Sequence, residues 1–367
     1  MGHAREGWAV RGWWRPIAAL AATAVLAGAT QSPPASPPAP TAPTPDTRTS
    51  TTTPAQPAAE AAPFVETPCE LLASPIFIGA SATAGFGVII TDPETKKRSL
   101  PLPLSAAFAG VVTNRKSDTV YRNVGSSLFF LSPVLTGTAQ IDRAVEMKPS
   151  LVVGIDYLFW FAYGDDNGKG GKIAAESERL EKLKLGFAQL ERLGGEVPIV
   201  VGDLPNMSAA IGKMLSREQV PDPATLDSLN AAIRDWAKAR PNVIPFPLAE
   251  LVTKLKSGET IVMSGMEFKR EGGRLLQSDE LHPTARGSIA MGLRVAELVQ
   301  QHRTKSGLSA CLTTASDERT AQARAHAAAD AVLKAKAGPK DAGGEKSNPG
   351  VGDVRQRAPA VPAGSTH

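Results

Sequence analysis

The sequence predicts a three-layer α/β/α sandwich built on a parallel sheet of five strands. Its apolar runs are short and lack polar alternation, which is typical of strands buried on both faces. Segments with helical periodicity lie between these runs. The expected strands are Pro75–Gly79, Thr119–Val124, Leu151–Ile155, Val197–Gly202 and Val243–Phe246. Ligands of open parallel sheets bind beyond the carboxyl ends of the strands, so residues that follow these strands are the first candidates for a site.

The connecting helices follow from the same periodicity. They are expected at Ser127–Met147, Ala175–Leu193, Pro223–Ala239 and Thr284–Gln301. Pro283 suits the first turn of the last helix, where a backbone N–H has no partner to lose. Strands that alternate with helices place the helices on both faces of one sheet.

The amino-terminal segments differ from ordinary globular sequence. Residues 1–29 place three arginines before the short apolar run 17–27 and end in small residues, which is typical of a secretory signal. The alternative is an uncleaved anchor. Residues 30–63 consist almost entirely of Pro, Ala, Thr, Ser and Gln, so they have little apolar surface to bury and are expected to form a disordered linker. We therefore expect export to the periplasm or the cell exterior, with no stable membrane span once the signal is cleaved.

Residues 64–312 hold the aromatic and branched apolar residues of the predicted domain, and about 250 residues can bury a core as one α/β domain. Residues 313–367 are rich in Ala, Lys, Gly and Pro and are expected to be a low-complexity tail, partly helical or disordered. The net charge of +4 comes with scattered basic residues, so nucleic-acid binding is not indicated. Cys69 and Cys311 stand at the two ends of the domain. They either form a disulfide, as exported proteins allow, or stay as two thiols.

A serine, a histidine and a carboxylate suggest nucleophilic catalysis. Ser81 follows the first expected strand directly after Gly79-Ala80, a position that exposes its hydroxyl and its backbone N–H. His282 is the one histidine inside the body of the domain, and Asp279 precedes it by three residues. Asp279 could orient the imidazole so that its other nitrogen takes the serine proton. The alternatives are a plain strand-to-loop turn at Ser81 and a loop histidine that bonds a carbonyl.

A third block, Tyr121-Arg122-Asn123-Val124-Gly125, ends the second expected strand. The N–H groups of Ser81 and Gly125 could together stabilise an oxyanion. An ordinary strand-to-helix turn is the alternative for Gly125.

In this order, the three blocks resemble the SGNH/GDSL hydrolase family. Gly79-Ala80-Ser81 with Gly85 corresponds to its Gly-Asp-Ser block, Asn123-Val124-Gly125 to its Asn-x-Gly turn, and Asp279-x-x-His282-Pro283 to its last block. The resemblance covers roughly residues 74–302. It implies a flavodoxin-like α/β/α fold and ester hydrolysis by Ser81, His282 and Asp279, with no metal or organic cofactor.

Two positions depart from the family pattern. Ala80 replaces the Asp of the first block, and Asp156 stands where the family has the Asn whose amide donates to the oxyanion. An ionised carboxylate beside a developing oxyanion opposes the reaction. Asp156 is therefore expected to be protonated or to play another part in substrate binding, and Asn206 is a candidate replacement donor. Trp160, in the aromatic stretch after the third strand, is expected either to line the cleft for an acyl or sugar group or to pack on the sheet.

The sequence thus predicts an exported serine hydrolase that acts on an ester-bearing small molecule, a lipid or an acylated polysaccharide. The alternative is a catalytically weak or inactive module of the same fold that binds envelope or polysaccharide material.

Overall fold

The computed structural model describes residues 69–115, 119–164 and 175–337, which lie in a compact unit that spans Pro63–His367. The predicted signal at 1–29 and the predicted linker at 30–63 lie outside the described residues.

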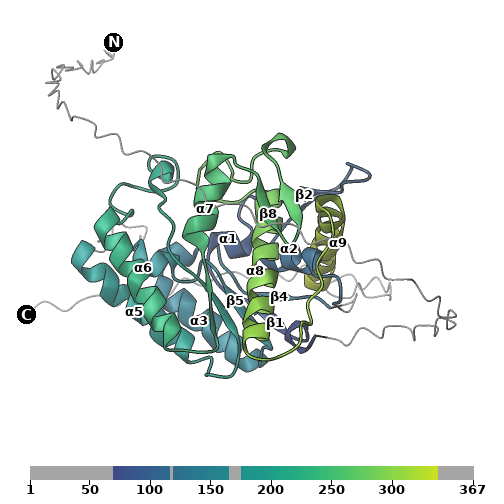
Figure 1. Cartoon of the computed structure of the whole chain (residues 1–367). Coiled ribbons are helices and arrows are strands. Elements are labelled where there is room, and N and C mark those ends of the chain that lie inside the picture. Colours follow the sequence, from purple (N-terminus) through teal and green to yellow (C-terminus); the bar gives the residue numbers. More distant parts are fainter. Residues whose placement is uncertain (1–68, 116–118, 165–174, 338–367) are drawn as a thin grey trace, which may run out of the picture. The chain divides into compact units, whose positions relative to one another are not determined.

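A five-stranded parallel sheet forms the centre of this unit (Figure 1). Its order is β4-β1-β5-β6-β7, and every neighbouring pair is parallel. The strands are β1 Pro75–Phe77, β4 Arg122–Asn123, β5 Leu151–Gly154, β6 Ile199–Gly202 and β7 Val243–Phe246. Each lies within an expected strand, so the predicted fold class is confirmed. Because β1 pairs with both β4 and β5 in parallel, the loops after these three strands meet at one edge.

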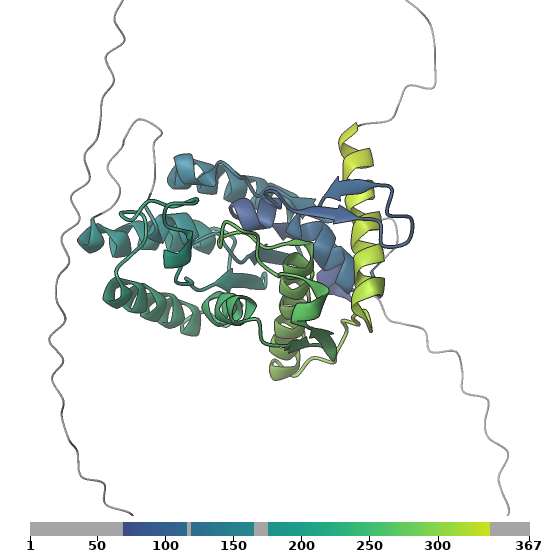
Figure 2. The same ribbon diagram turned by 90° about the horizontal axis from the view of Figure 1, so that it is seen from above.

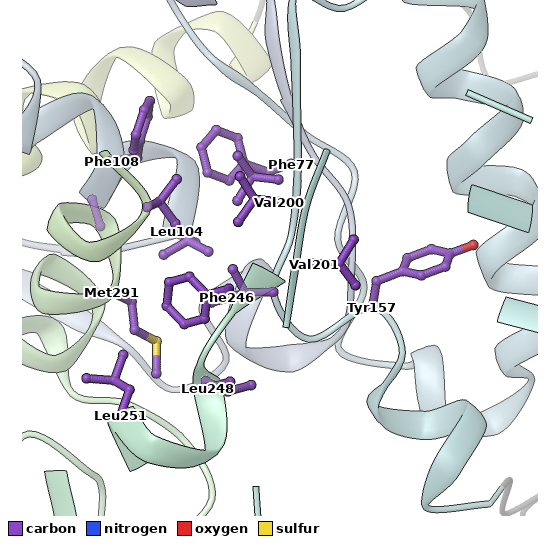
Figure 3. Close-up of a cluster of buried hydrophobic side chains, with 14 of the residues drawn as sticks. Phe77, Leu104, Phe108, Tyr157, Val200, Val201, Phe246, Leu248, Leu251 and Met291 are labelled. Carbon is purple, nitrogen blue, oxygen red and sulfur yellow. The ribbon is translucent and has the colours of Figure 1, made fainter. Parts of the chain in front are cut away.

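Helices cover both faces of the sheet and complete the three layers. They are α2 Leu104–Val111, α3 Pro133–Met147, α4 Phe159–Ala162, α5 Arg179–Glu191, α6 Pro223–Lys238, α7 Leu248–Ser257 and α8 Ala285–Lys305. Figure 3 shows the strand alternation that fills both sides: Val200 points toward the side chains of α2 and α8, whereas Val201 points toward Tyr157 on the opposite face. Val200 and Val201 are both buried.

Several elements are additional to the expected ones. Two antiparallel hairpins pair β2 Ile89–Thr91 with β3 Ser99–Pro101 and β8 Ile261–Met263 with β9 Met266–Phe268. Short 3₁₀ turns occur at Glu70–Leu72, Phe129–Leu131, Glu176–Glu178, Ser208–Ala210 and Arg270–Gly272. The helix expected from Ser127 begins instead at Pro133, because a proline at the first position favours a helix start there.

The carboxyl-terminal helix α9, Glu318–Ala337, packs on the body rather than standing apart from it. Figure 2 shows it along the edge of the unit, in yellow, beside the β2–β3 hairpin. A Cβ added to Gly110 of α2 would lie 2.6 Å from Ala325, so the two helices approach closely through small residues. Arg324 donates to the carbonyls of Gly110 and Val112 at the end of α2. The packed body therefore continues to residue 337, beyond the expected end at 312.

A disulfide joins Cys69 to Cys311, with their Cα atoms 5.1 Å apart. It ties the start of the described chain to the segment after α8, which is the first of the two alternatives that the sequence left open. Among the described residues, no helix combines the length and the apolar character needed to span a membrane.

Candidate active site

Ser81 lies at the first position of a short helix, α1 Ser81–Ala84, just beyond strand β1. The chain leaves the strand through Gly79, whose φ of +141° is rarely accessible to other residues. The buried side chain of Gln140, from α3, holds this turn: its Oε1 accepts from the Gly79 N–H at 2.7 Å, and its Nε2 donates to the Gly79 carbonyl at 2.9 Å. The turn that follows β1 is therefore held in place by a side chain of helix α3.

Asp156 organises the turn that carries Ser81. Its carboxylate accepts the backbone N–H groups of Ala80, Ala82 and Thr83 at 3.0, 2.9 and 3.1 Å, and the Thr83 hydroxyl at 2.6 Å. A Cβ at Gly79 would lie only 2.1 Å from Asp156 Oδ1. Glycine is thus required at 79 both for its φ and for the space that the carboxylate occupies.

These contacts decide the role of Asp156. Burial raises the pKa of its carboxyl group, while the hydrogen bonds from Thr83, Ala80 and Ala82 lower it and leave the net shift upward. All four partners are donors, and a carboxylate that only accepts satisfies all of them. Asp156 therefore acts through the Ser81 turn, as a residue that positions the turn, although it also lines the pocket beside Ser81.

His282 is held by Asp279 in the loop before α8. Its Nδ1 lies 2.7 Å from Asp279 Oδ2, and Asp279 Oδ1 accepts the backbone N–H groups of Leu281 and His282 at 2.9 and 3.0 Å. Burial raises the pKa of Asp279, but the hydrogen bonds from His282 and Leu281 outweigh it and leave the pKa below its usual value. The ionised carboxylate fixes the ring with Nδ1 engaged, which leaves Nε2 as the proton acceptor.

Ser81 and His282 line the same pocket, although about two hundred residues separate them in sequence. Most of the remaining wall is apolar and comes from the segment after β6, from helices α4, α7 and α8 and from the loop before α8: Phe159, Pro205, Met207, Leu248, Val252, Leu281 and Met291. The cavity is small, about 40 Å³. Within the described residues no hydrogen bond joins the Ser81 hydroxyl to His282. Such bonds are often long before substrate binds.

Of the expected oxyanion donors, one is free. The Ser81 N–H has no hydrogen-bond partner in the described part of the chain, so it can donate to a ligand. The Gly125 N–H donates instead to Asn123 Oδ1 at 2.9 Å, while Asn123 Nδ2 donates to the Thr83 carbonyl at 2.8 Å. The Asn123-Val124-Gly125 block thus braces the end of α1.

Asn206, a candidate oxyanion donor, and Trp160, a candidate cleft residue, do not line the pocket. Asn206 is exposed and its Oδ1 accepts from the Ser208 N–H, whereas its neighbours Pro205 and Met207 line the pocket. Trp160 is buried and packs against Phe130 and Phe159. Phe159, one residue earlier, supplies the aromatic wall in its place because adjacent positions of a helix face different directions.

Gln277 and Phe86 are site residues that the sequence analysis missed. The Gln277 side chain donates to the Phe86 carbonyl at 3.0 Å and to the Pro283 carbonyl at 2.9 Å, and its N–H donates to the His282 carbonyl at 2.8 Å. It therefore joins the loop that follows Ser81 to the loop that carries His282. The half-exposed Phe86 ring lies 4.8 Å from the His282 ring, centroid to centroid. No motif marks either residue, because each acts through contacts between distant segments.

One group of three potential metal ligands occurs in the described residues, at Cys69, Glu70 and Cys311. The disulfide occupies both sulfur atoms there, so this group has no thiolate to offer a metal.

Comparison with known proteins found similarity to solved structures alone. No family model and no curated protein matches the chain. Among solved structures it is similar to a lipase/acylhydrolase from Enterococcus faecalis (15% identity, TM-score 0.37, 66% of this chain and 98% of that chain). It is also similar to a member of the lipolytic G-D-S-L family from Veillonella parvula (13%, TM-score 0.37, 61% and 97%). A third match is a carbohydrate esterase family 3 structure from Talaromyces cellulolyticus (13%, TM-score 0.35, 63% and 99%). Similarity at this level does not establish a shared activity, so function has to be inferred from the site.

Proposed function

We propose that this protein is a serine hydrolase that cleaves carboxylic esters through an acyl-enzyme. The observation that carries the proposal is that His282, bonded through Nδ1 to Asp279 at 2.7 Å, lines the same pocket as Ser81. A nucleophile, a base and a residue that orients the base are the parts that acyl transfer requires.

In the proposed reaction, the Ser81 hydroxyl attacks the ester carbonyl while His282 Nε2 takes its proton. Asp279 stabilises the imidazolium that forms. The Ser81 N–H donates to the oxyanion of the tetrahedral intermediate. His282 then gives its proton to the departing alcohol, which leaves the acyl-enzyme. A water molecule, deprotonated by His282, attacks the acyl carbon and returns free serine and a carboxylic acid.

The pocket supports a short acyl group. One water molecule needs about 10–15 Å³ of such space, so a cavity of about 40 Å³ with an apolar wall suits a group the size of acetyl. The ester itself is proposed to belong to a small molecule, a lipid or an acylated polysaccharide whose acyl group is short.

We further propose that the protein is exported to the periplasm or the cell exterior. The Cys69–Cys311 disulfide supports this location, because such bonds persist mainly in oxidising compartments.

The test uses the whole chain with 4-nitrophenyl acetate and a fluorophosphonate probe. Wild type should hydrolyse the ester and take up one probe per chain at Ser81, and Ser81→Ala should do neither. Ser126→Ala is the matched control, because Ser126 lies in the neighbouring turn but does not line the pocket. A wild-type protein that neither hydrolyses a broad panel of acetyl esters nor reacts with the probe would instead support the non-catalytic binding module.

A further inference from the structure

A second pocket lies beside the proposed catalytic pocket and has a different character. Its cavity is about 380 Å³, against about 40 Å³ for the catalytic one. Its wall comes from the end of α7, from β9 and from the segment 273–280 that leads to His282. The charged residues of this wall are Lys256, Glu259, Arg274 and Glu280.

Two stretches of chain place the pockets next to each other. In α7, Val252 lines the catalytic pocket and Lys256 the second one. Four residues of helix span about 6 Å. In the loop before α8, Glu280 lines the second pocket, whereas Leu281 and His282 line the catalytic pocket. One bound molecule can therefore reach both.

Arg274 and Lys256 line this second pocket, and a third basic residue, Lys213, lies beside its Glu280. Glu280 Oε1 accepts from Arg274 at 2.7 Å and lies 3.9 Å from the Lys213 ammonium. Lys256 forms no salt bridge within the described residues; its ammonium donates to the Asn206 carbonyl at 3.2 Å. Glu259 is exposed, at the outer side of the wall. The wall itself thus holds two cations and two carboxylates, and Lys213, which contacts Glu280 without lining the pocket, is a third cation beside it.

The pKa of Lys256 indicates that its charge is poorly stabilised in this surrounding. Burial lowers the pKa of its ammonium, Glu280 raises it, Lys213 lowers it again, and the net shift is downward. The protein therefore stabilises this charge less well than water does, and an anion placed beside it would improve its environment.

From this arrangement we infer that the second pocket binds an anionic group, a carboxylate or a phosphate, on the leaving-alcohol part of the ester. The inference rests on the proposed function. The small apolar pocket takes the acyl group, so the alcohol part must extend away from it. Because His282 protonates the alcohol oxygen, the alcohol part begins beside His282. From there it can extend into the second pocket, where Lys256 and Arg274 can bind its anionic group.

The kinetic test compares acetyl esters with matched leaving groups: 4-acetoxybenzoate, 4-acetoxyphenyl phosphate and the neutral 4-acetoxybenzamide. A hydrogen bond to a charged group contributes about 1.5–3 kcal/mol, so wild type should have a kcat/KM at least about tenfold higher for an anionic ester than for the amide. The gain should appear mainly in KM, and the preferred anion shows whether a carboxylate or a phosphate fits. Lys256→Gln should bring the ratio of kcat/KM for the anionic ester to kcat/KM for the amide close to one.

Lys254→Gln is the matched control. Lys254 lies two residues away in α7, pairs with Glu250 and does not line the pocket, so its removal should leave the preference intact. Equal kcat/KM for the anionic and neutral esters in wild type would overturn the inference, as would a loss in Lys256→Gln that affects all three esters alike.

A binding measurement separates this inference from the proposed catalysis. Isothermal titration of 4-hydroxybenzoate and 4-hydroxyphenyl phosphate into Ser81→Ala needs no turnover. At least one of them should bind to Ser81→Ala and to the Ser81→Ala/Lys254→Gln double variant, and at least about tenfold more weakly to Ser81→Ala/Lys256→Gln. No binding of either anion, or equal binding to the two double variants, would refute the anion site even if ester hydrolysis is confirmed.

Discussion

Asp156→Asn tests how the Ser81 turn is held. The carboxylate receives four donors, whereas an amide has one oxygen to accept them. The least costly orientation places the new NH₂ at the Oδ1 position, where the Thr83 hydroxyl can rotate to accept but the Ala80 N–H loses its partner. That lost bond is worth about 1.5–3 kcal/mol, and the remaining bonds weaken because the acceptor is neutral.

Removal of a buried charge offsets part of this loss, because burial already raises the pKa of Asp156. We expect a net destabilisation of about 2 kcal/mol, which lowers Tm by roughly 4–8 °C for a domain of this size. The turn that carries Ser81 also shifts, and a displacement of about 1 Å can reduce the rate about 10²-fold.

Calorimetry and the rate of fluorophosphonate labelling, measured well below Tm, check the two effects separately. Asp203→Asn is the control: Asp203 is also a carboxylate whose pKa is raised by burial, but it caps α7 through the Ala249 N–H at 2.7 Å. It should lose stability and keep the labelling rate. If Asp156→Asn raises kcat instead, its amide serves the oxyanion, and the role assigned to Asp156 is wrong.

Four further changes are expected to have measurable effects. Asp279→Ala should lower kcat about 10⁴-fold, because His282 Nδ1 loses its acceptor. The lowered pKa of Asp279 means that its charge stabilises the fold above about pH 4. The difference in urea stability between wild type and Asp279→Asn should therefore shrink as pH falls from 5 to 3. Gln277→Ala should reduce kcat about tenfold or more by separating the two loops, with KM changed less. Reduction of Cys69–Cys311, which closes a loop of 242 residues, should lower the urea-derived stability by up to about 5 kcal/mol.

The strands were predictable because a strand buried on both faces shows as an apolar run. All five appear within the expected ranges, and β7 matches at both ends. Helix α7 escaped prediction because it follows β7 after a single proline, and its short pattern merges with the strand. The Ala-rich helix α9 lacks the large apolar residues that indicate a buried face, and it packs by close approach of alanines to Gly110 instead.

The site was predictable only as far as its parts lie in local motifs. Asp279-x-x-His282 implies its own hydrogen bond, because residues three apart in a tight loop can meet, and the structure has that bond. Gln140 and Gln277 carry no such signal, since each binds backbone atoms of a segment far away in sequence. Trp160 and Phe159 cannot be distinguished by sequence, because the direction of each ring depends on where the helix starts.

The two departures from the SGNH/GDSL pattern have one physical explanation. Position 80 has no carboxylate where that pattern has one, and position 156 has a carboxylate where the pattern has an amide; in the structure the carboxylate of Asp156 accepts the N–H of Ala80 itself. The carboxylate of Asp156, just after β5, thus holds the backbone on both sides of Ser81. The same exchange leaves no amide at position 156, so the Ser81 N–H is the proposed oxyanion donor among the described pocket residues. Loss of one such donor typically costs about 10²–10³ in rate. Slow acyl transfer with full labelling at Ser81 is therefore the kinetic behaviour that this exchange predicts.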